Sequence, residues 1–410
     1  MKKLLLTIFL LFFVVIVVMT AQVDDDLSKE SADLIGRIDT VRTSESYLYL
    51  YGIFASEGDE PAKVGRKILE EYRKLDNNDS YEVIEYPDED KIPLPTGDEF
   101  CKAWEKGCLE YIFSSQYDID SLLNENKLLL ARSSKFFEFA EYETLSKPTV
   151  HELFPPYQYI AAAERIKILE AISVYSKGNA TRALESLSLQ FSKLRKSMAL
   201  QDNLIGKLVL LMKLSEVIDV MSVILSNSKI EAKLIPDLTQ SEKSFHMIAA
   251  REFGMSYYTF KNLDKHPEFF EIGGDFPGWM TRTVYKPNMT INAIAPIYYK
   301  LEQLAQFPSV DFAKRIEANN SDRPSTSKLR NYVGSVLIAI SPEYTEYVAR
   351  FYDLDAKLAI FNQVHHLNLS LDDMKNPYYG KEVPEVVNGN LCFNGPLEDK
   401  RSLRCLRVKI

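Results

Sequence analysis

The chain has 410 residues, of which 46% are hydrophobic and 26% are charged, so it can bury a substantial core and is not disordered throughout. Its formal net charge of −9 argues against a nucleic-acid-binding protein, because surfaces that bind phosphate carry an excess of Lys and Arg. With only 16 Gly and 18 Pro, the composition excludes collagen-like and low-complexity chains and favours a helix-rich fold.

The N-terminus predicts export. Two lysines precede an uncharged apolar stretch over residues 4–21, and three aspartates follow it. The stretch exceeds an ordinary signal-peptide core and reaches the lower limit of a membrane-spanning helix, and Met19 is larger than the residue expected three positions before a cleavage site. We therefore predict that residues 1–22 form an uncleaved anchor in the inner membrane, with the remaining chain in the periplasm; secretion after signal cleavage is the alternative.

Four cysteines fall into two sequence-local pairs, and an even number in an exported chain suggests two disulfides. Three connectivities are possible. Pairing Cys101 with Cys108 and Cys392 with Cys405 is predicted because each closes a short loop. Neither pair has the spacing of a zinc site, so no metal or other cofactor is predicted.

Residues 23–150 are predicted to form an N-terminal helical region. Apolar residues recur at helical spacing over residues 27–76, 101–113 and 119–139. Residues 76–100 between them are acidic and carry three prolines, as is typical of an exposed loop.

A main helical domain is predicted over residues 151–375. No proline occurs between Pro156 and Pro236, and apolar residues recur there in steps of three and four, which predicts three amphipathic helices with short connections. Gly178 ends the first helix, Asn179 begins the second, and the third begins near Asp202. The turn resembles that of a tetratricopeptide hairpin, but no second copy follows, so a single hairpin is favoured over a repeat array.

Further helices are predicted over residues 291–307, 329–340 and 342–362. Residues 376–410 are predicted to form a small β appendage, with a hairpin at Asn388-Gly389 and its strands joined by the second cysteine pair. The predicted fold class is thus mainly α, built from antiparallel helical hairpins that are partly solenoid-like.

Residues 261–292 interrupt the helices with a long, aromatic-rich loop. Aromatic rings supply much of the anchoring area in recognition sites, so Phe276, Trp279 and Tyr285 are candidate binding residues. A connection held on the core by its own rings is the alternative.

The same loop contains acids near a tryptophan, the combination that sugar hydrolysis uses. Glu268, Glu271 and Asp275 are therefore weak candidates for catalytic carboxylates, although such clusters arise by chance in a chain with 58 acidic residues.

The order of several features resembles a group of uncharacterised, exported, mostly helical bacterial proteins. These features are the N-terminal membrane segment, helices with a cysteine pair, the sequence KPNMTIN at residues 286–292, and an Asn-Pro-Tyr-x-Gly element at residues 376–380 followed by short strands. The resemblance implies the fold and a location in the cell envelope. It carries over no catalytic residue.

Common enzyme motifs are missing: the sequence has no G-x-S-x-G, G-x-G-x-x-G, phosphate loop or H-E-x-x-H. His365 and His366 are adjacent, and neighbouring residues on a helix point too far apart to share a metal ion easily. The preferred hypothesis is a non-enzymatic binding or scaffold protein of the bacterial cell envelope, whose partner is another envelope protein or peptide. The alternative is an exported hydrolase acting on a cell-wall or other extracytoplasmic polymer.

Overall fold

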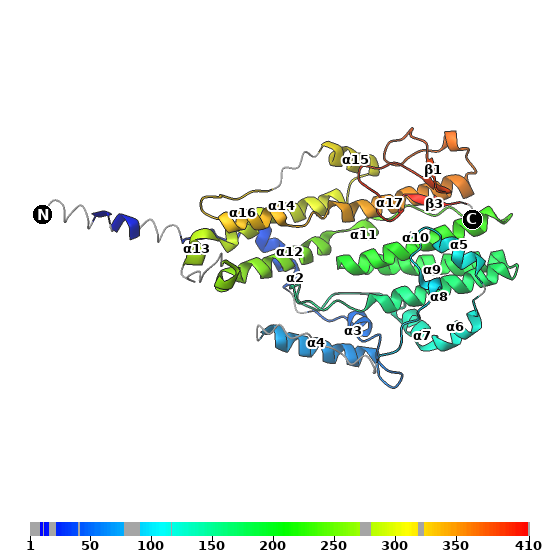
Figure 1. The fold of residues 1–410 in the computed structure, drawn as a ribbon, viewed down its shortest axis with the longest axis horizontal. Helices are drawn as coiled ribbons and strands as arrows, with labels where there is room; N and C mark the ends of the chain where they lie inside the picture. Colours follow the sequence, from blue (N-terminus) through cyan, green and yellow to red (C-terminus); the bar gives the residue numbers. More distant parts are fainter. Residues whose placement is uncertain are drawn as a thin grey trace.

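The structure is a computed structural model, and it describes residues 9–10, 12–15, 22–39, 42–77, 91–115, 117–270, 280–318 and 324–408. It is mainly helical with a small antiparallel sheet near the C-terminus, which confirms the predicted fold class. Most helices run along the long axis of an elongated body (Figure 1). One continuous hydrophobic core extends through the body from Leu34 to Leu406, across the predicted boundaries at residues 150 and 375.

Most of the N-terminal region forms one long edge of the body (Figure 1). Ser28 and Ser44 accept hydrogen bonds from backbone N–H groups in the first turns of the two helices that they precede, which fixes where each helix begins. The helices are α2 (Lys29–Ile38), α3 (Glu45–Tyr51), α4 (Pro61–Asn77), η2 (Asp98–Phe100), α5 (Cys108–Ser114), α6 (Ile119–Glu125) and α7 (Lys127–Phe136).

Three consecutive helices form the centre, as the periodicity predicts: α8 (Tyr157–Ser176), α9 (Ala180–Leu200) and α10 (Leu204–Ser226). Gly178 adopts a φ of 88° in the first turn, a conformation that a residue with a Cβ rarely takes. Asn203 caps α10 by accepting a hydrogen bond from the N–H of Gly206. Because α8, α9, α17 (Thr345–Phe361) and strand β3 (Cys405–Arg407) all contact α10, this helix is buried along most of its length.

The other long edge consists of the C-terminal helices, and α14 and α17 follow one another along it (Figure 1). Helix α12 packs against α2 and α14, which also contact each other. The remaining elements are α11 (Gln240–Lys243), α12 (His246–Asn262), η3 (Leu263–Lys265), η4 (Pro267–Phe270), α13 (Thr281–Val284), α14 (Pro287–Leu304), α15 (Ser309–Ala318), α16 (Tyr332–Ile340), α17 (Thr345–Phe361), η6 (Asn362–His366) and η7 (Leu371–Asp373).

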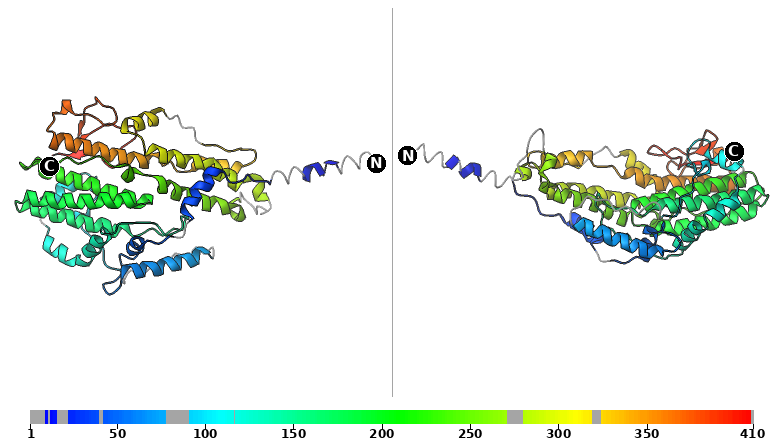
Figure 2. Two further views of the ribbon diagram at one scale, coloured as in Figure 1. Left: turned by 180° about the vertical axis from the view of Figure 1, so that it is seen from behind. Right: turned by 60° about the horizontal axis from the view of Figure 1, so that its bottom comes forward.

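The predicted β appendage is a three-stranded antiparallel sheet in the order β1 (Glu385–Val387), β2 (Asn390–Cys392) and β3 (Cys405–Arg407). The turn between β1 and β2 is formed by Asn388 and Gly389, both with positive φ, as the Asn-Gly pair predicts. The sheet lies at the opposite end of the body from the point where residues 22–26 join it (Figure 2).

Both predicted disulfides are present: Cys101 pairs with Cys108, and Cys392 pairs with Cys405. They are compatible with a location outside the cytoplasm. Among the described residues, no helix has the length and hydropathy needed to cross a membrane. Most of the predicted membrane segment, residues 4–21, lies outside the described residues, as does most of the acidic loop 76–100.

The sequence assigned helix from Cys101, but helix α5 begins at Cys108. The disulfide closes residues 101–108 into a loop, and Gly107 at its end has a φ of 87° that interrupts right-handed helix. Helix α15 was not predicted, and α14 begins at Pro287, earlier than expected, because proline is well accommodated in a first helical turn.

Candidate functional site

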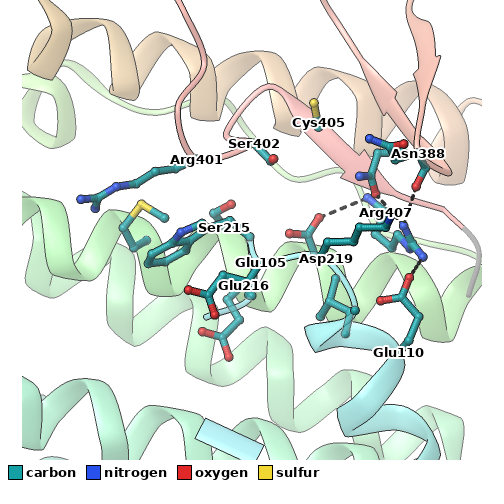
Figure 3. Close-up of a pocket in the computed structure, with 17 residues that line it drawn as sticks. Glu105, Glu110, Ser215, Glu216, Asp219, Asn388, Arg401, Ser402, Cys405 and Arg407 are labelled. Atoms are coloured by element: carbon teal, nitrogen blue, oxygen red, sulfur yellow. Dashed lines mark hydrogen bonds and ion pairs between the residues drawn. The ribbon is translucent and has the colours of Figure 1, made fainter. Parts of the chain in front are cut away.

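A cavity of about 180 Å³ lies where α10 meets the two disulfide-closed segments (Figure 3). Its floor is formed by α10, its first wall by the loop of residues 101–108, and its second wall by strand β3 with the segment before it. The three parts are far apart in the sequence, and only the tertiary fold brings them together.

The first wall presents an aromatic ring. Trp104 lies inside the loop that the Cys101–Cys108 disulfide closes, and it lines the cavity. The guanidinium of Arg401, from the opposite wall, lies 5.3 Å from the centre of the Trp104 ring. This cation–π contact joins the two walls across the mouth of the cavity.

The second wall is fixed by Arg407 on β3. Its backbone N–H donates to Oδ1 of Asp219 on α10, at 3.2 Å, and its guanidinium donates to the carbonyl of Asn388, at 2.9 Å, and pairs with Glu110 on α5 (Figure 3). The Cys392–Cys405 disulfide links β2 to β3 directly opposite one another. The sheet is therefore held firmly against α10.

The floor carries two buried carboxylates one turn apart, each balanced by buried cations. Glu216 lies 2.8 Å from Nζ of Lys213 and 3.0 Å from Nη1 of Arg165. Burial alone would raise the pKa of Glu216, but these two cations outweigh it and hold the pKa below its usual value. Asp219 lies 2.7 Å from Nζ of Lys357, yet burial dominates there and raises its pKa.

Among the α10 residues that line the cavity, Ser215 carries a hydroxyl, and this hydroxyl contacts a lysine. Nζ of Lys357 donates to its Oγ at 2.7 Å, an arrangement that outwardly resembles a serine–lysine dyad. The same ammonium also donates to Asp219. Lys357 on α17 therefore contacts two side chains of α10 one turn apart, Ser215 and Asp219, and joins these two helices.

Several N–H groups around the cavity retain hydrogen-bonding capacity. Within the described part of the chain, the guanidinium of Arg401 and the indole N–H of Trp104 have no hydrogen-bond acceptor, and the buried Nε of Arg407 has none either. The carboxylates of Glu105 and Glu110 are already paired, with Lys102 and Arg407 respectively. The cavity is therefore suited to a ligand rich in acceptors.

A second cavity, of about 500 Å³, lies between the end of α2, residues 144–148 and α12. Arg251 in its wall pairs with the buried Glu152 and donates to the carbonyl of Ser146. Burial raises the pKa of Glu152 to about 7, although Arg251 acts in the opposite direction. Asp202 nearby accepts hydrogen bonds from both the N–H and the hydroxyl of Thr144. These buried groups satisfy one another, so this site links the N-terminal region to the main helices.

The candidate residues in the aromatic loop are mostly outside the described residues. This holds for Glu271, Asp275, Phe276 and Trp279, and although the backbone of Glu268 lies in η4, its side chain is not described. The carboxylate cluster thus stays a prediction.

Tyr285 can be placed, and it does not present its ring to a partner. Its side chain is fully buried, its ring packs on Phe270, and its hydroxyl donates to the carbonyl of Phe260 at 2.8 Å. The alternative considered for this loop, a ring that holds the connection on the core, therefore applies to Tyr285.

The two adjacent histidines have separate structural partners. His365 lies 2.8 Å from the hydroxyl of Ser222, and burial lowers its pKa to about 4; His366 lies 3.0 Å from the carbonyl of Ala232. No group of three or more potential metal ligands occurs among the described residues.

Sequence reasoning did not find Trp104, Arg401 or Arg407. One signal for Trp104 was its position inside a short cysteine-closed loop, and the alternation of apolar and basic residues in the last strand could have placed Arg407. No protein-family model, curated protein or solved structure matches this chain. The geometry of the cavity is therefore the basis for a functional proposal.

Proposed function

We propose that this chain is an exported protein of the bacterial cell envelope, anchored in the inner membrane by residues 4–21, and that it binds a partner without catalysing a reaction. Two disulfides and the charge pattern at the N-terminus support the location. We further propose that the cavity beside α10 takes a carboxylate of another envelope protein or peptide.

The observation that carries the binding proposal is a set of N–H groups around the cavity that have no hydrogen-bond acceptor within the described part of the chain. Arg401, Trp104 and Nε of Arg407 supply N–H groups, whereas the carboxylates that line the cavity are already paired with cations. A guanidinium binds a carboxylate more strongly than a neutral acceptor, because the hydrogen bonds are charge-assisted. The volume of about 180 Å³ is suited to the end of a peptide rather than to a large ligand.

The chain offers its own probe for a binding test, because it has two tryptophans and one of them, Trp104, lines the cavity. In a Trp279→Phe variant of the full chain in detergent, the fluorescence reports on Trp104 alone. We expect short peptides with a free C-terminal carboxylate to change this fluorescence saturably, and the same peptides with an amidated C-terminus to bind at least about tenfold more weakly.

Substitution Arg401→Ala should weaken binding of the free carboxylate to the level of the amide. Lys400→Ala is the matched control, since Lys400 is the neighbouring cation but pairs with Glu346 outside the cavity. Equal binding of acid and amide, or an equal effect of the two substitutions, would contradict the proposal. Cleavage of the added peptide or of a cell-wall polymer would favour the hydrolase instead.

A further inference from the structure

Helix α16 has an apolar face that the rest of the described chain leaves uncovered. Tyr332, Val336 and Ile340, spaced four residues apart and therefore on one side of the helix, are 61%, 44% and 72% exposed. Leu329, just before the helix, is 94% exposed. The opposite side of α16 packs on α14 and buries Gly334 and Ile338.

This arrangement is unusual for a helix at a protein surface. The sequence of α16, YVGSVLIAI, contains no charged residue, and Ser335 is its only hydrophilic side chain apart from the tyrosine hydroxyl. A helix that borders water normally carries polar and charged groups on its outer face. Contiguous exposed apolar side chains of this kind mark a surface that something else covers.

The start of α16 lies beside the point where the apolar N-terminal segment joins the folded body. Nη2 of Arg330 donates to the carbonyl of Val23 and to Oδ1 of Asp25, each at 3.2 Å. Asp24 accepts hydrogen bonds from the N–H groups of Asn288 and Met289 in the first turn of α14. These contacts fix residues 23–25 against the ends of both helices.

The short connections on both sides of the contact between Arg330 and Val23 therefore place the end of the apolar segment close to this face. Residue 21, the last of the uncharged segment, is two positions before Val23, and Arg330 is two positions before Tyr332. If residues 4–21 enter a bilayer, the bilayer surface lies next to the beginning of α16. Lys328 lies just before this beginning, and Tyr332 is of the type that concentrates at membrane interfaces.

We propose that Leu329, Tyr332, Val336 and Ile340 form a membrane-contacting face of α16, which lies in the interface of the bilayer that holds residues 4–21. This inference rests on the proposed anchoring. It adds that the folded body lies on the membrane with the α16 side down, and is not merely tethered at a distance from it. An interfacial helix of this sort contributes by burying its apolar side chains among head groups and acyl chains.

The test uses a nitroxide label at a single introduced cysteine in the full chain. The four native cysteines are all in disulfides, so a Val336→Cys substitution offers one free thiol. The protein is incorporated into vesicles of phosphatidylethanolamine and phosphatidylglycerol, and collision of the label with oxygen and with a water-soluble nickel complex is measured. Leu189→Cys on α9 is the control, because Leu189 is an apolar residue of comparable exposure, 60%, on another helix.

We expect the label at residue 336 to show, in vesicles, a several-fold higher ratio of oxygen to nickel collisions than the label at residue 189. Flotation of the vesicles reports separately on the anchor. If the chain floats but the label at residue 336 stays as accessible to nickel as the control, the membrane-contacting face is overturned and the anchor stands. If the chain does not float, both are overturned.

A second variant tests the same proposal without a label at residue 336, where the label itself could change membrane contact. Tyr332→Ser/Val336→Ser/Ile340→Ser changes exposed side chains only, so it should fold normally and still float through residues 4–21. We expect a fluorophore at Leu329→Cys to lose its membrane-induced blue shift in this background. Dipolar coupling between nitroxide labels at residue 336 of two chains would show instead that a second copy covers this face, and it would overturn the proposal.

Discussion

Asp353 on α17 and Arg404, just before β3, form an ion pair 2.9 Å long in the interior of the protein. The hydroxyl of Tyr378 donates to the same carboxylate oxygen at 2.7 Å. Asp353 belongs to the helical body, whereas Arg404 belongs to the last segment of the chain, so the ion pair joins these two parts. The small sheet is therefore attached by buried charge as well as by apolar contacts.

Removing one partner of this pair should be costly, because it leaves the other buried without compensation. We expect Arg404→Met to lower the free energy of unfolding by about 3–5 kcal/mol. Lys400→Met is the control, since the pair of Lys400 with Glu346 is exposed and should contribute nothing measurable. Urea unfolding of both variants gives the comparison, and equal stabilities would show that the buried pair does not hold the segment.

Glu152 should make stability depend on pH. Its pKa rises from 4.5 to about 7 on folding, mainly through burial, so the native state favours the protonated form. Its stabilising contribution is thus complete below pH 4.5 and is lost as the pH rises through 7. Relative to Glu152→Gln, the wild type should lose about 3 kcal/mol across this interval.

Thermal unfolding at closely spaced pH values tests this expectation. Glu138→Gln serves as the control, because Glu138 is an exposed carboxylate paired with Lys135, and its removal should leave the shape of the profile unchanged. A profile for Glu152→Gln that is parallel to the wild type would mean that folding does not change the pKa of Glu152, which contradicts the expectation.

The two disulfides should differ in how much they contribute to the free energy of unfolding. Removing the Cys392–Cys405 pair as a double serine variant should lower the free energy of unfolding by about 2–4 kcal/mol, since it frees a longer loop and the strands of a sheet too small to be stable alone. Removing Cys101–Cys108 frees a shorter loop and should cost less.

The shorter disulfide should instead affect the cavity. Because Trp104 lies in the loop that Cys101 and Cys108 close, we expect their double serine variant to weaken the cation–π contact with Arg401 and to shift the emission of Trp104 to the red. Equal spectra with and without this disulfide would show that the loop is held by other contacts.

Local patterns in the sequence predicted those parts of the fold that depend on local contacts. The positions of Gly178 and Asn179 marked the turn between α8 and α9, because a positive φ and an N-terminal cap are properties of single residues. The Asn-Gly turn and both disulfides followed from short spacings in the same way.

The cavity could not be predicted by these means. Arg407 meets Glu110 across 297 positions of the sequence, and Arg401 meets Trp104 across a similar span. Such pairs form because α10 packs against segments near both ends of the chain. The periodicity of apolar residues in the sequence does not indicate this packing. The same limit applies to α16: its apolar pattern predicted a helix, but the pattern does not show which face is covered, and only the fold shows that one face is exposed among the described residues.

Asn203 offers a last test, because it combines a helix cap with a buried hydrogen-bond network. Its Oδ1 accepts from the N–H of Gly206 at 2.8 Å, and its Nδ2 donates to the hydroxyls of Thr144 and Tyr157. We expect Asn203→Ala to lower the free energy of unfolding by about 2–3 kcal/mol, since the buried hydroxyls lose a partner as well.

Asn179 is the matched control, because it caps α9 with the same side-chain geometry, accepting from the N–H of Arg182 at 3.1 Å, but at an exposed position. Its replacement by alanine should cost only about 1 kcal/mol, the value of a cap alone. Chemical denaturation of both variants measures the difference. If the two substitutions cost the same, the network around Asn203 adds nothing to the cap, and the junction between residues 142–144 and α10 depends on apolar packing and on Asp202 instead.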